Sequence, residues 1–217
     1  MDAQNPSADG CRPTPSLRER KKEQARAAMH RAALELTCEH GSTCITVEQI
    51  ADRAGVSPRT FFNYWHTKEQ AILGHDPHRI AHLGTLLRER PGDEAPEDSM
   101  IVLSRAYIDT APNDPELQEM RRAVLKREPA LGHLSMDAAN EVQWELIQIM
   151  HERLLEQSPD LGDDEAWQRS ALVVLHAFAS IRAAFVTAMR QNVSVAEALE
   201  SIEAVRAAII QERGARA

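Results

Sequence analysis

The first strong pattern in the chain is helical. Apolar side chains recur at the i, i+3, i+4, i+7 spacing of one helix face at Met29, Ala32, Ala33 and Leu36. Ser16, with Glu19 three residues later, predicts a capping box at the start of this helix. Gly41 predicts its end, because glycine commonly follows the last residue of a helix.

Two short helices separated by a glycine are predicted next. Thr46 and Gln49 have the spacing of a second capping box, which would begin a short helix that runs through Ala54 and is followed by Gly55. Ser57 is then placed to cap a third helix whose first residue is Pro58, where a missing N–H costs nothing. This order of helix, glycine turn and helix is the layout of a helix-turn-helix.

The rest of the chain alternates between helical segments and short breaks rich in Pro, Gly and Asp. The breaks are expected at 75–77, 89–98, 111–114, 127–132, 157–164 and 190–194. The segment 166–189 is apolar nearly all round, which predicts a helix covered on most sides. Residues 195–210 keep a single apolar face. We therefore expect an all-α protein of about nine helices, with a three-helix helix-turn-helix domain followed by a helical bundle.

Composition adds expectations about the cellular setting. At 217 residues and 43% hydrophobic, the chain is long enough to bury a core. No uninterrupted run of about 18 apolar residues is present, which predicts no membrane span and no membrane partner. The basic start lacks the apolar segment of a secretory signal, which favours the cytoplasm. Cys11, Cys38 and Cys44 are an odd number, which fits a reducing compartment better than a disulfide framework.

The net charge of −8 is unevenly distributed. Residues 1–70 hold 10 Lys/Arg against 9 Asp/Glu, and residues 71–217 hold the other 15 against 24. Basic residues dominate between 12 and 31, among them Arg18, Lys21 and Lys22. A solvated helix face and a contact with a polyanion both fit this stretch. Residues 1–15, rich in Pro, Ser and Asp, are expected to form a disordered arm beside it.

The stretch GVSPRTFFNYWHTKE, residues 55–69, gathers aromatic side chains in a chain with only 4% aromatics. On a helix starting at Pro58, Phe61 and Phe62 would face inward, with Trp65 just beyond them. The aromatic side chains are thus expected to belong partly to the core and partly to a surface.

The outward side of this helix carries residue types that read DNA. Arg59 can bind guanine with two hydrogen bonds, Asn63 can do the same with adenine, and the Thr60 methyl suits a thymine methyl. Polar groups and helix starts for the phosphates are offered by Thr46, Ser57, Pro58, Tyr64 and Lys68. The solvated face of an ordinary helical hairpin fits the same residues.

Residues 23–73 resemble the DNA-binding domain of TetR-type transcriptional regulators, especially actinobacterial members with a VSPRTFFNY recognition helix. The resemblance implies an all-helical homodimer, with a DNA-binding domain at 16–66 and a helical domain at 67–217 that binds an effector and dimerises. It also implies a repressor of a palindromic double-stranded operator, released by a small, mainly apolar effector.

The family's recognition-helix contacts carry over to Ser57, Arg59, Thr60, Asn63 and Tyr64, and its phosphate-binding lysine to Lys68. Two features depart from the family pattern. Trp65 and His66 stand where Phe followed by a small residue or proline is commoner, which alters the backbone contact at the next helix. The segment TCEHGSTC, residues 37–44, carries two cysteines at positions to which the family is indifferent.

The last two helices, at about 164–190 and 194–212, are candidates for a dimer interface. Paired with their symmetry mates they would form a four-helix interface, which would explain the apolar character of the first. The candidate residues are Leu172, Leu175, Ala179, Arg182, Ala183, Val186, Ile202, Val205 and Ile209. A wholly monomeric core fits the same pattern.

A polar residue in the apolar helix has two interpretations. His176 would be hydrogen-bonded in the core, or it would line an effector cavity. In the second case it would be joined by Trp144, Gln148 and His151 of the preceding helix and by Phe178.

Other chemistry is weaker in the sequence. His75, His78 and His82 share a helical spacing, but Pro77 interrupts it and surface histidines are common, so no metal and no cofactor is expected. A regulator gated by oxidation of Cys38 and Cys44, or by a protein partner, is the alternative to effector control. No Gly-rich phosphate loop, G-x-S-x-G or H-E-x-x-H occurs, so an enzyme using the C-terminal pocket is only a remote alternative.

Overall fold

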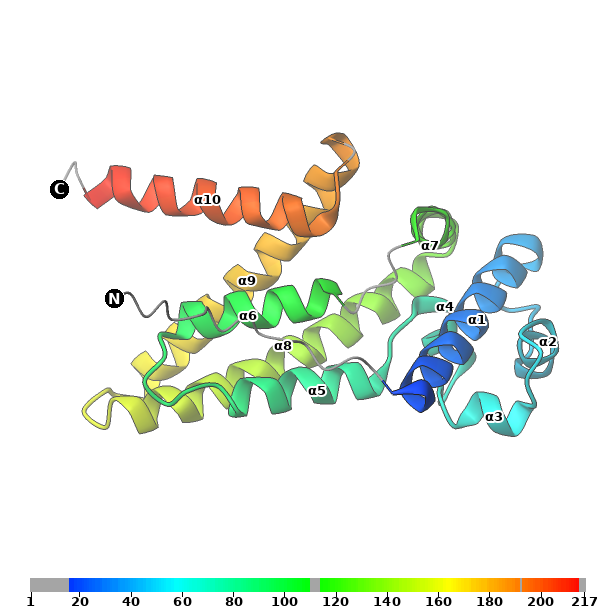
Figure 1. Ribbon diagram of the computed structural model, residues 1–217, viewed down its shortest axis with the longest axis horizontal. Helices are drawn as coiled ribbons and strands as arrows, with labels where there is room; N and C mark the ends of the chain where they lie inside the picture. Colours follow the sequence, from blue (N-terminus) through cyan, green and yellow to red (C-terminus); the bar gives the residue numbers. More distant parts are fainter. Residues whose placement is uncertain (1–15, 110–113, 192, 215–217) are drawn as a thin grey trace, which may run out of the picture. The chain divides into compact units, whose positions relative to one another are not determined.

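The computed structural model describes residues 16–109, 114–191 and 193–214, without the side chains of 19, 77–80, 209–210 and 212–214 (Figure 1). The described residues form ten α-helices and no strand, which confirms the all-helical fold. The helices are α1 (Leu17–His40), α2 (Val47–Arg53), α3 (Pro58–Phe62), α4 (Lys68–Leu73), α5 (Pro77–Arg88), α6 (Pro96–Asp109), α7 (Pro115–Arg127), α8 (Pro129–Gln157), α9 (Asp163–Gln191) and α10 (Val195–Gly214). The expected arm at 1–15 lies outside the described residues.

The chain divides into two compact units, one ending at Ile72 and the other beginning at Leu73. The division falls inside α4. The physical reason is burial, because Ala71 and Ile72 are fully buried. His30 Nδ1 of α1 also lies 2.6 Å from the carbonyl oxygen of Ala71, a hydrogen-bonding distance.

Two differences from the expected helices have local causes. The described residues form ten helices, against about nine expected, and the helix after α3 is the short α4. The expected break at 127–132 shrinks to Glu128, because Pro129 is the first residue of α8 and a proline is tolerated there.

The first unit is built around the buried side chains of its helices. α1 packs on α2, and α2 packs on α3. The largest fully buried side chains are Met29, Leu34, Ile45, Ile50, Phe61, Trp65 and Ile72. The apolar stripe of α1 predicted from the sequence is therefore core, since Met29, Ala32, Ala33 and Leu36 are all buried.

Local hydrogen bonds set the start of α2. Thr46 Oγ1 accepts from the Gln49 N–H at 3.3 Å, and Gln49 Oε1 accepts from the Thr46 N–H at 2.8 Å. The capping box predicted for this pair is confirmed. After α2, Gly55 adopts a φ of 68°, a left-handed conformation that favours glycine and turns the chain toward α3. The Glu19 side chain of the other predicted capping box lies outside the described residues.

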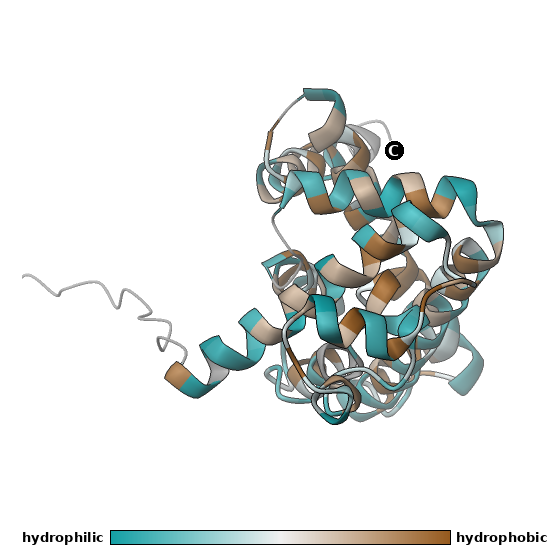
Figure 2. Cartoon of the chain, turned by 90° about the vertical axis from the view of Figure 1, so that its right-hand side faces the viewer, coloured by the Kyte–Doolittle hydropathy of each residue, from teal (hydrophilic) through white to brown (hydrophobic). Residues whose placement is uncertain are grey.

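The second unit is a helical bundle centred on two long helices of 29 residues each, α8 and α9. α9 packs against α8, α6 and α10, while α8 also contacts α5 and α7. The main core includes Leu87, Met100, Leu146, Met150 and Val174, and a smaller cluster around Ile181 and Leu199 joins α9 to α10. Figure 2 shows hydrophobic and hydrophilic residues alternating along these helices, as amphipathic packing requires.

The α5–α6 connection is held by a polar network centred on Glu94. Arg90 Nε donates to Glu94 Oε2 at 2.8 Å, and Ser99 Oγ donates to the same oxygen at 2.6 Å. Arg153 of α8 donates to the carbonyl oxygens of Arg90 and Pro91 at 3.0 and 2.8 Å. The Arg90 guanidinium, with help from Ser99, lowers the pKa of the Glu94 carboxyl to about 2.

Helix α9 is long and apolar enough to cross a membrane by length and composition alone, a test that the core helix of a soluble protein also meets. Only 33% of its most apolar 18-residue stretch is buried in the structure. The exposed remainder includes Leu172, Leu175, Val186 and Met189, so α9 presents an apolar face that its own unit does not cover.

Candidate nucleic-acid interface

Helix α3 begins as its sequence predicts. Ser57 is the N-cap, and its Oγ accepts from the Thr60 N–H at 3.1 Å. The same oxygen lies 2.9 Å from Thr60 Oγ1, so the two hydroxyls hydrogen-bond each other. Pro58 occupies the first turn, where its missing N–H has no partner to lose. These contacts hold the start of α3 without using Arg59.

The exposed side chains of α3 include two of the predicted base readers. Arg59 and Asn63 are exposed, while Thr60 is half-buried beside Ser57. The helix ends at Phe62, and Asn63 is its C-cap, still in the right-handed helical region. Arg59 and Asn63 are therefore displayed by a short capped helix and the turn that closes it.

Phe62 departs from its predicted place in the core. Its side chain is 51% exposed, whereas Phe61 is fully buried. Consecutive residues on a helix are about 100° apart, so two neighbouring phenylalanines cannot both enter a narrow inward face. The Phe62 ring meets the Phe61 ring edge to face, with centroids 5.6 Å apart. Phe62 thus adds an apolar side chain to the outer surface of α3, which sequence reasoning missed.

The residues after α3 are held by α1. The Arg26 guanidinium lies over the Tyr64 ring, 5.7 Å from its centroid. Trp65 is buried, as predicted, with its ring centroid 6.5 Å from that of His30. Tyr64 is half-buried, so α1 fixes the position of its ring.

Lys68, the predicted phosphate ligand, has a role inside the unit. Its Nζ donates to the carbonyl oxygens of Ser42 and Ile45, at 2.7 and 3.0 Å. Both acceptors lie in the connection between α1 and α2. An ammonium carries three N–H donors, so one is left over from these two bonds. The lysine therefore anchors the loop that precedes the helix-turn-helix.

Exposed basic and polar side chains extend beyond α3. Arg18, Lys21 and Lys22 are exposed on the first turns of α1, which are mostly hydrophilic in Figure 2. Thr46 and Ser57 are exposed at the starts of α2 and α3. Lysines, arginines and helix starts are the groups that contact DNA phosphates.

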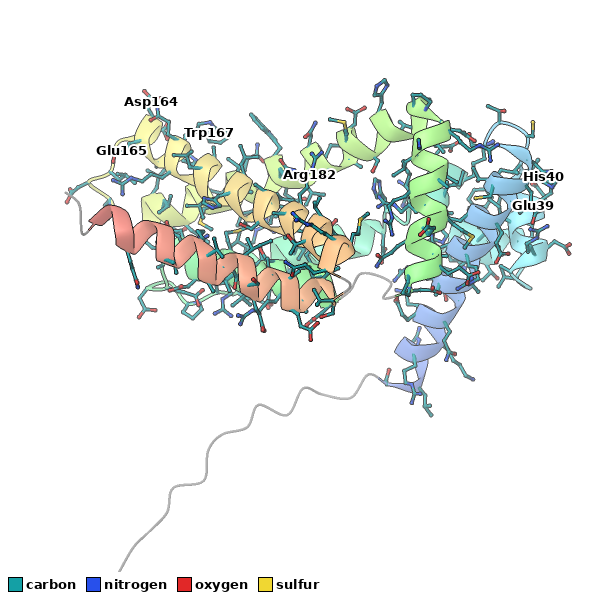
Figure 3. All side chains as sticks on the ribbon, turned by 90° about the horizontal axis from the view of Figure 1, so that it is seen from above. Glu39, His40, Asp164, Glu165, Trp167 and Arg182 are labelled. Atoms are coloured by element: carbon teal, nitrogen blue, oxygen red, sulfur yellow. The ribbon has the colours of Figure 1, made fainter. Side chains whose placement is uncertain are left out.

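An ion pair fixes the end of α1 to the end of α2. Arg53 Nη1 and Nη2 donate to the two carboxylate oxygens of Glu39, at 2.6 and 2.9 Å. The hydrogen bonds from Arg53 lower the pKa of Glu39. Figure 3 shows Glu39 and His40 at the C-terminal end of α1. Because Arg53 is engaged here, it is not an available base reader.

Comparison with known proteins decides the family. Residues 31–72 match the family model described as bacterial regulatory proteins, tetR family. The HTH-type transcriptional regulator TcmR of Streptomyces glaucescens is 31% identical over 174 residues, which cover 76% of this chain and 75% of TcmR. The chain belongs to the TetR family. It is a DNA-binding transcriptional regulator.

Solved TetR-family structures show more distant similarity. A TetR-family regulator from Syntrophomonas wolfei is 12% identical, with a TM-score of 0.48 over 87% of this chain and 95% of that chain. FadR of Thermus thermophilus, a TetR-family repressor, is 23% identical, with a TM-score of 0.42 over 83% of this chain and 92% of that chain. At these scores neither similarity bears on function.

Of the five residues predicted to line an effector pocket, His176 lines one of the two cavities described below, and the other four line neither. Trp144 is 57% exposed and stacks edge to face with Trp167, which also contacts the His151 ring. Gln148 is exposed, and Phe178 packs against Tyr107. The physical reason is that these side chains point to different faces of two long helices, which helical spacing alone does not resolve.

The cavity of this TetR-family protein that His176 borders is about 190 Å³ in volume. Charged and polar side chains line it from three helices: Glu97 of α6, His176 and Ser180 of α9, and Glu203 and Arg206 of α10. Burial raises the pKa of the Glu203 carboxyl, against the opposing effect of Arg105 at 3.6 Å. Leu172, an exposed residue of α9, lies on the same rim.

The predicted dimer residues lie mostly on exposed faces of α9 and α10. Leu172, Leu175, Ala179, Arg182, Ala183, Val186 and Val205 are exposed. Ile202 is half-buried against the cluster that joins the two helices. The Ile209 side chain lies outside the described residues. Figure 3 places Arg182 well along α9, and Asp164, Glu165 and Trp167 near its start.

The remaining candidates are scattered. Cys38 is half-buried, Cys44 is exposed with its Sγ 3.8 Å from Thr43 Oγ1, and neither is in a disulfide. His75 Nε2 lies 3.4 Å from Ser135 Oγ, His82 is exposed, and the His78 side chain lies outside the described residues. Among the side chains that the structure describes, no three His, Cys, Asp or Glu residues cluster as metal ligands.

Proposed function

We propose that this TetR-family regulator binds a two-fold operator as a homodimer, with α3 of each protomer in the major groove. The observation that carries the proposal is the exposed set on α3 and its closing turn: Arg59, Phe62 and Asn63. Arg59 and Asn63 match the donor and acceptor edges of guanine and adenine, and the exposed Phe62 ring suits a thymine methyl.

Contacts with DNA phosphates position α3 in the major groove. Ser57 and Thr46 lie at helix starts, where backbone N–H groups favour anions. Arg18, Lys21 and Lys22 supply further positive charge from α1. Such contacts carry affinity for any sequence, whereas the α3 side chains carry the discrimination between bases.

The partner protomer covers the apolar face of α9 and α10. Leu172 is 71% exposed, and Val186 and Val205 are exposed on the same two helices. Large apolar side chains gathered on one surface mark an interaction site. A two-fold dimer formed through this face would present two α3 helices to half-sites about 34 Å apart.

The regulator acts as a repressor and is released by a small effector bound in the second unit. Release requires the effector to bind more tightly to a dimer shape in which the two α3 helices no longer match successive major grooves. Two cavities among the described residues of α5, α6, α8, α9 and α10 are candidate places for such a molecule.

The experiment is selection of bound fragments from random double-stranded DNA at fixed salt, with Arg59→Ala in parallel. A pseudo-palindrome that becomes degenerate at one base of each half-site for Arg59→Ala would support the proposal. Arg169→Ala, a change at an exposed arginine of α9 paired with Glu165, is the matched control and should select the wild-type sequence. An identical motif for wild type and Arg59→Ala would refute the assignment of Arg59 as a base reader.

A further inference from the structure

The cavity beside His176 is lined by two serines that have no partner within the described part of the chain. Ser104 of α6 and Ser180 of α9 are only 3% and 9% exposed, and both line this cavity. Neither hydroxyl forms a hydrogen bond with the residues that the structure describes. Ser170, another buried serine of α9, instead donates to the carbonyl oxygen of Ala166 at 2.8 Å. A buried hydroxyl without a partner costs free energy, so Ser104 and Ser180 gain from a polar group placed inside the cavity.

Charged side chains of both signs line the same cavity from α6 and α10. Glu97 is exposed, Arg206 is half-buried, and neither forms an ion pair within the described part of the chain. Glu203 has an ion pair with Arg105 at 3.6 Å, which is longer than a hydrogen bond. Burial raises the pKa of the Glu203 carboxyl, and the attraction of the two arginines does not offset this effect. Acidic and basic groups of the lining are therefore both able to bind a ligand.

The second unit has another, smaller cavity of about 60 Å³, whose polar lining differs. His75, Asp76 and Tyr107 line it, and each already interacts with another part of the chain. Its remaining lining is apolar apart from Gly74. Of these two cavities, the one beside His176 is therefore the one whose polar side chains lack internal partners.

The charges around the cavity beside His176 disfavour a ligand of a single sign. An anion would be repelled by Glu97 and Glu203, and a cation by Arg206. A neutral molecule would leave all three without a counter-charge. Residues three apart on a helix lie about 5–6 Å apart at their Cβ atoms, so Glu203 and Arg206 present opposite charges side by side. A molecule that carries both signs on neighbouring atoms matches this arrangement.

We propose that this cavity binds an α-amino acid with a short apolar side chain, with the carboxylate at Arg206 and the ammonium at Glu203. The inference rests on the proposed function and deepens it by naming the class of the effector. A guanidinium matches a carboxylate with two parallel hydrogen bonds. The ligand side chain packs on the hydrophobic part of the lining, which includes Met100, Ile101, Val173 and Ala177. The volume of about 190 Å³ is below the roughly 300–1,000 Å³ of drug-sized sites, which restricts the ligand to a small molecule.

The cavity is linked to the proposed dimer face through both of the helices that form that face. On α9, Ser180 lines the cavity while the preceding residue, Ala179, is exposed. On α10, Glu203 lines the cavity while Val205 is exposed. An amino acid that binds α10 together with α6 and α9 therefore changes how α9 and α10 pack, and with it the dimer shape that sets the separation of the two α3 helices.

The test is the melting temperature of the full chain with L-valine, isobutylamine or isovalerate, at constant pH and ionic strength. Isobutylamine lacks the carboxylate of valine, and isovalerate lacks its ammonium. Valine should raise the melting temperature saturably, by about 3 °C at roughly ten times its Kd. Each analogue of single charge should bind roughly tenfold more weakly. Equal affinity for the three compounds, or no saturable shift with valine, would overturn the inference.

Substitutions in the lining test the assigned roles. Arg206→Met and Glu203→Gln should each weaken valine binding roughly tenfold. Arg190→Met and Glu156→Gln, at exposed positions outside the cavity, are the matched controls and should leave valine binding unchanged. Ser180→Ala serves if a charge variant does not fold, because it removes a hydroxyl that has no partner in the described chain. Its melting temperature without valine should not fall, while its valine binding should weaken about threefold or more.

Wild-type valine binding by the folded Arg206→Met protein or by Ser180→Ala would contradict the inference. Saturating valine should also weaken binding to the selected operator roughly tenfold in wild type but not in Arg206→Met. A failed operator selection would remove the proposed function while leaving the melting results intact. An operator bound by a protein that ignores valine would remove only the amino-acid assignment.

Discussion

Neighbouring residues on α3 differ sharply in burial. Phe61 is fully buried and supports the helix, while Arg59, Phe62 and Asn63 are left on the outside. The side chains that we propose to meet DNA thus lie only one or two positions from this buried residue. Substituting the outer residues should change recognition while leaving the fold intact.

Arg59→Ala and Asn63→Ala should each weaken operator binding by about 1–3 kcal/mol and relax the preference at one base of each half-site. Each change removes a pair of hydrogen bonds to a base edge. Binding to the selected operator and to its single-base variants, measured at one salt concentration, tests this. A uniform loss across all sequences would show that these residues contact phosphates instead.

Lys68→Ala should destabilise the first unit by about 2 kcal/mol, because two carbonyl oxygens lose a charged hydrogen-bond donor. Hydrogen exchange of the amides around Ser42 and Ile45 is the measurement, since it reports on this unit alone. Lys21→Ala, at an exposed position of α1, is the control and should leave exchange unchanged while weakening DNA binding. If Lys68→Ala leaves hydrogen exchange unchanged and weakens binding to every DNA sequence, Lys68 contacts a DNA phosphate, as the sequence predicted, and does not anchor the loop.

At the scale of elements, short connections are held by polar side chains that reach across helices. Lys68 holds the α1–α2 connection, and Arg153 and Glu94 hold the α5–α6 connection. Both connections are exposed to water on one side, where apolar packing is unavailable. Charged hydrogen bonds therefore define their shape, which makes the second connection sensitive to pH.

The Glu94 network should lose stability in acid. The folded pKa of Glu94 is about 2, below the ordinary value of 4.5, so its contribution is fully present above pH 4.5 and is lost as the pH falls toward 2. Because the carboxylate is partly solvated, we expect on the order of 1–2 kcal/mol, less than the full shift would give. Urea unfolding of wild type and Glu94→Gln between pH 2.5 and about 6 measures the difference.

Wild type should be more stable than Glu94→Gln near neutral pH, and the two should converge in acid. Asp93→Asn, at the exposed neighbour in the same connection, is the control and should follow wild type. A constant difference between wild type and Glu94→Gln at every pH would contradict the assignment to this carboxyl.

At the scale of the molecule, the exposed apolar face of α9 and α10 is the feature that a single protomer leaves unexplained. About two-thirds of the most apolar stretch of α9 is not buried within one protomer, although the chain is a DNA-binding regulator and not a membrane protein by family. A second protomer packed on this face would cover the exposed apolar side chains. It would also cover Leu172 at the edge of the cavity beside His176.

Leu172→Glu should convert the dimer to a monomer and weaken operator binding roughly 100-fold, because the two half-sites are no longer linked. Light scattering on a sizing column gives the mass, and titration of labelled operator gives the affinity. Met136→Glu is the control, since Met136 is 63% exposed on α8 and lies outside the proposed interface. A Leu172→Glu protein that is still dimeric would place the interface elsewhere.

Much of this architecture is local in origin and could be predicted from the chain. The start of α2 depends on Thr46 and Gln49, and the start of α3 on Ser57 and Pro58, all within a few positions of one another. Burial of Met29 and Leu36 follows from a periodicity visible within a few turns. The exposure of Arg59 and Asn63 was also predictable, because the helix that displays them is defined by its own caps.

What the chain alone could not decide involves partners distant in sequence. Lys68 finds its carbonyl oxygens on Ser42 and Ile45, and Arg121 finds Leu73, 48 positions away. For the same reason, Phe62 was expected in the core, and Trp144 and Phe178 were expected in one pocket. A helical period fixes the relative directions of side chains but not which direction faces the core. The sequence by itself determined the helical class and the starts of α2 and α3, since these depend on neighbours in the chain. Only the tertiary structure decided which faces are covered and which distant carbonyl oxygens the charged side chains bind, since both depend on every element packed around a side chain.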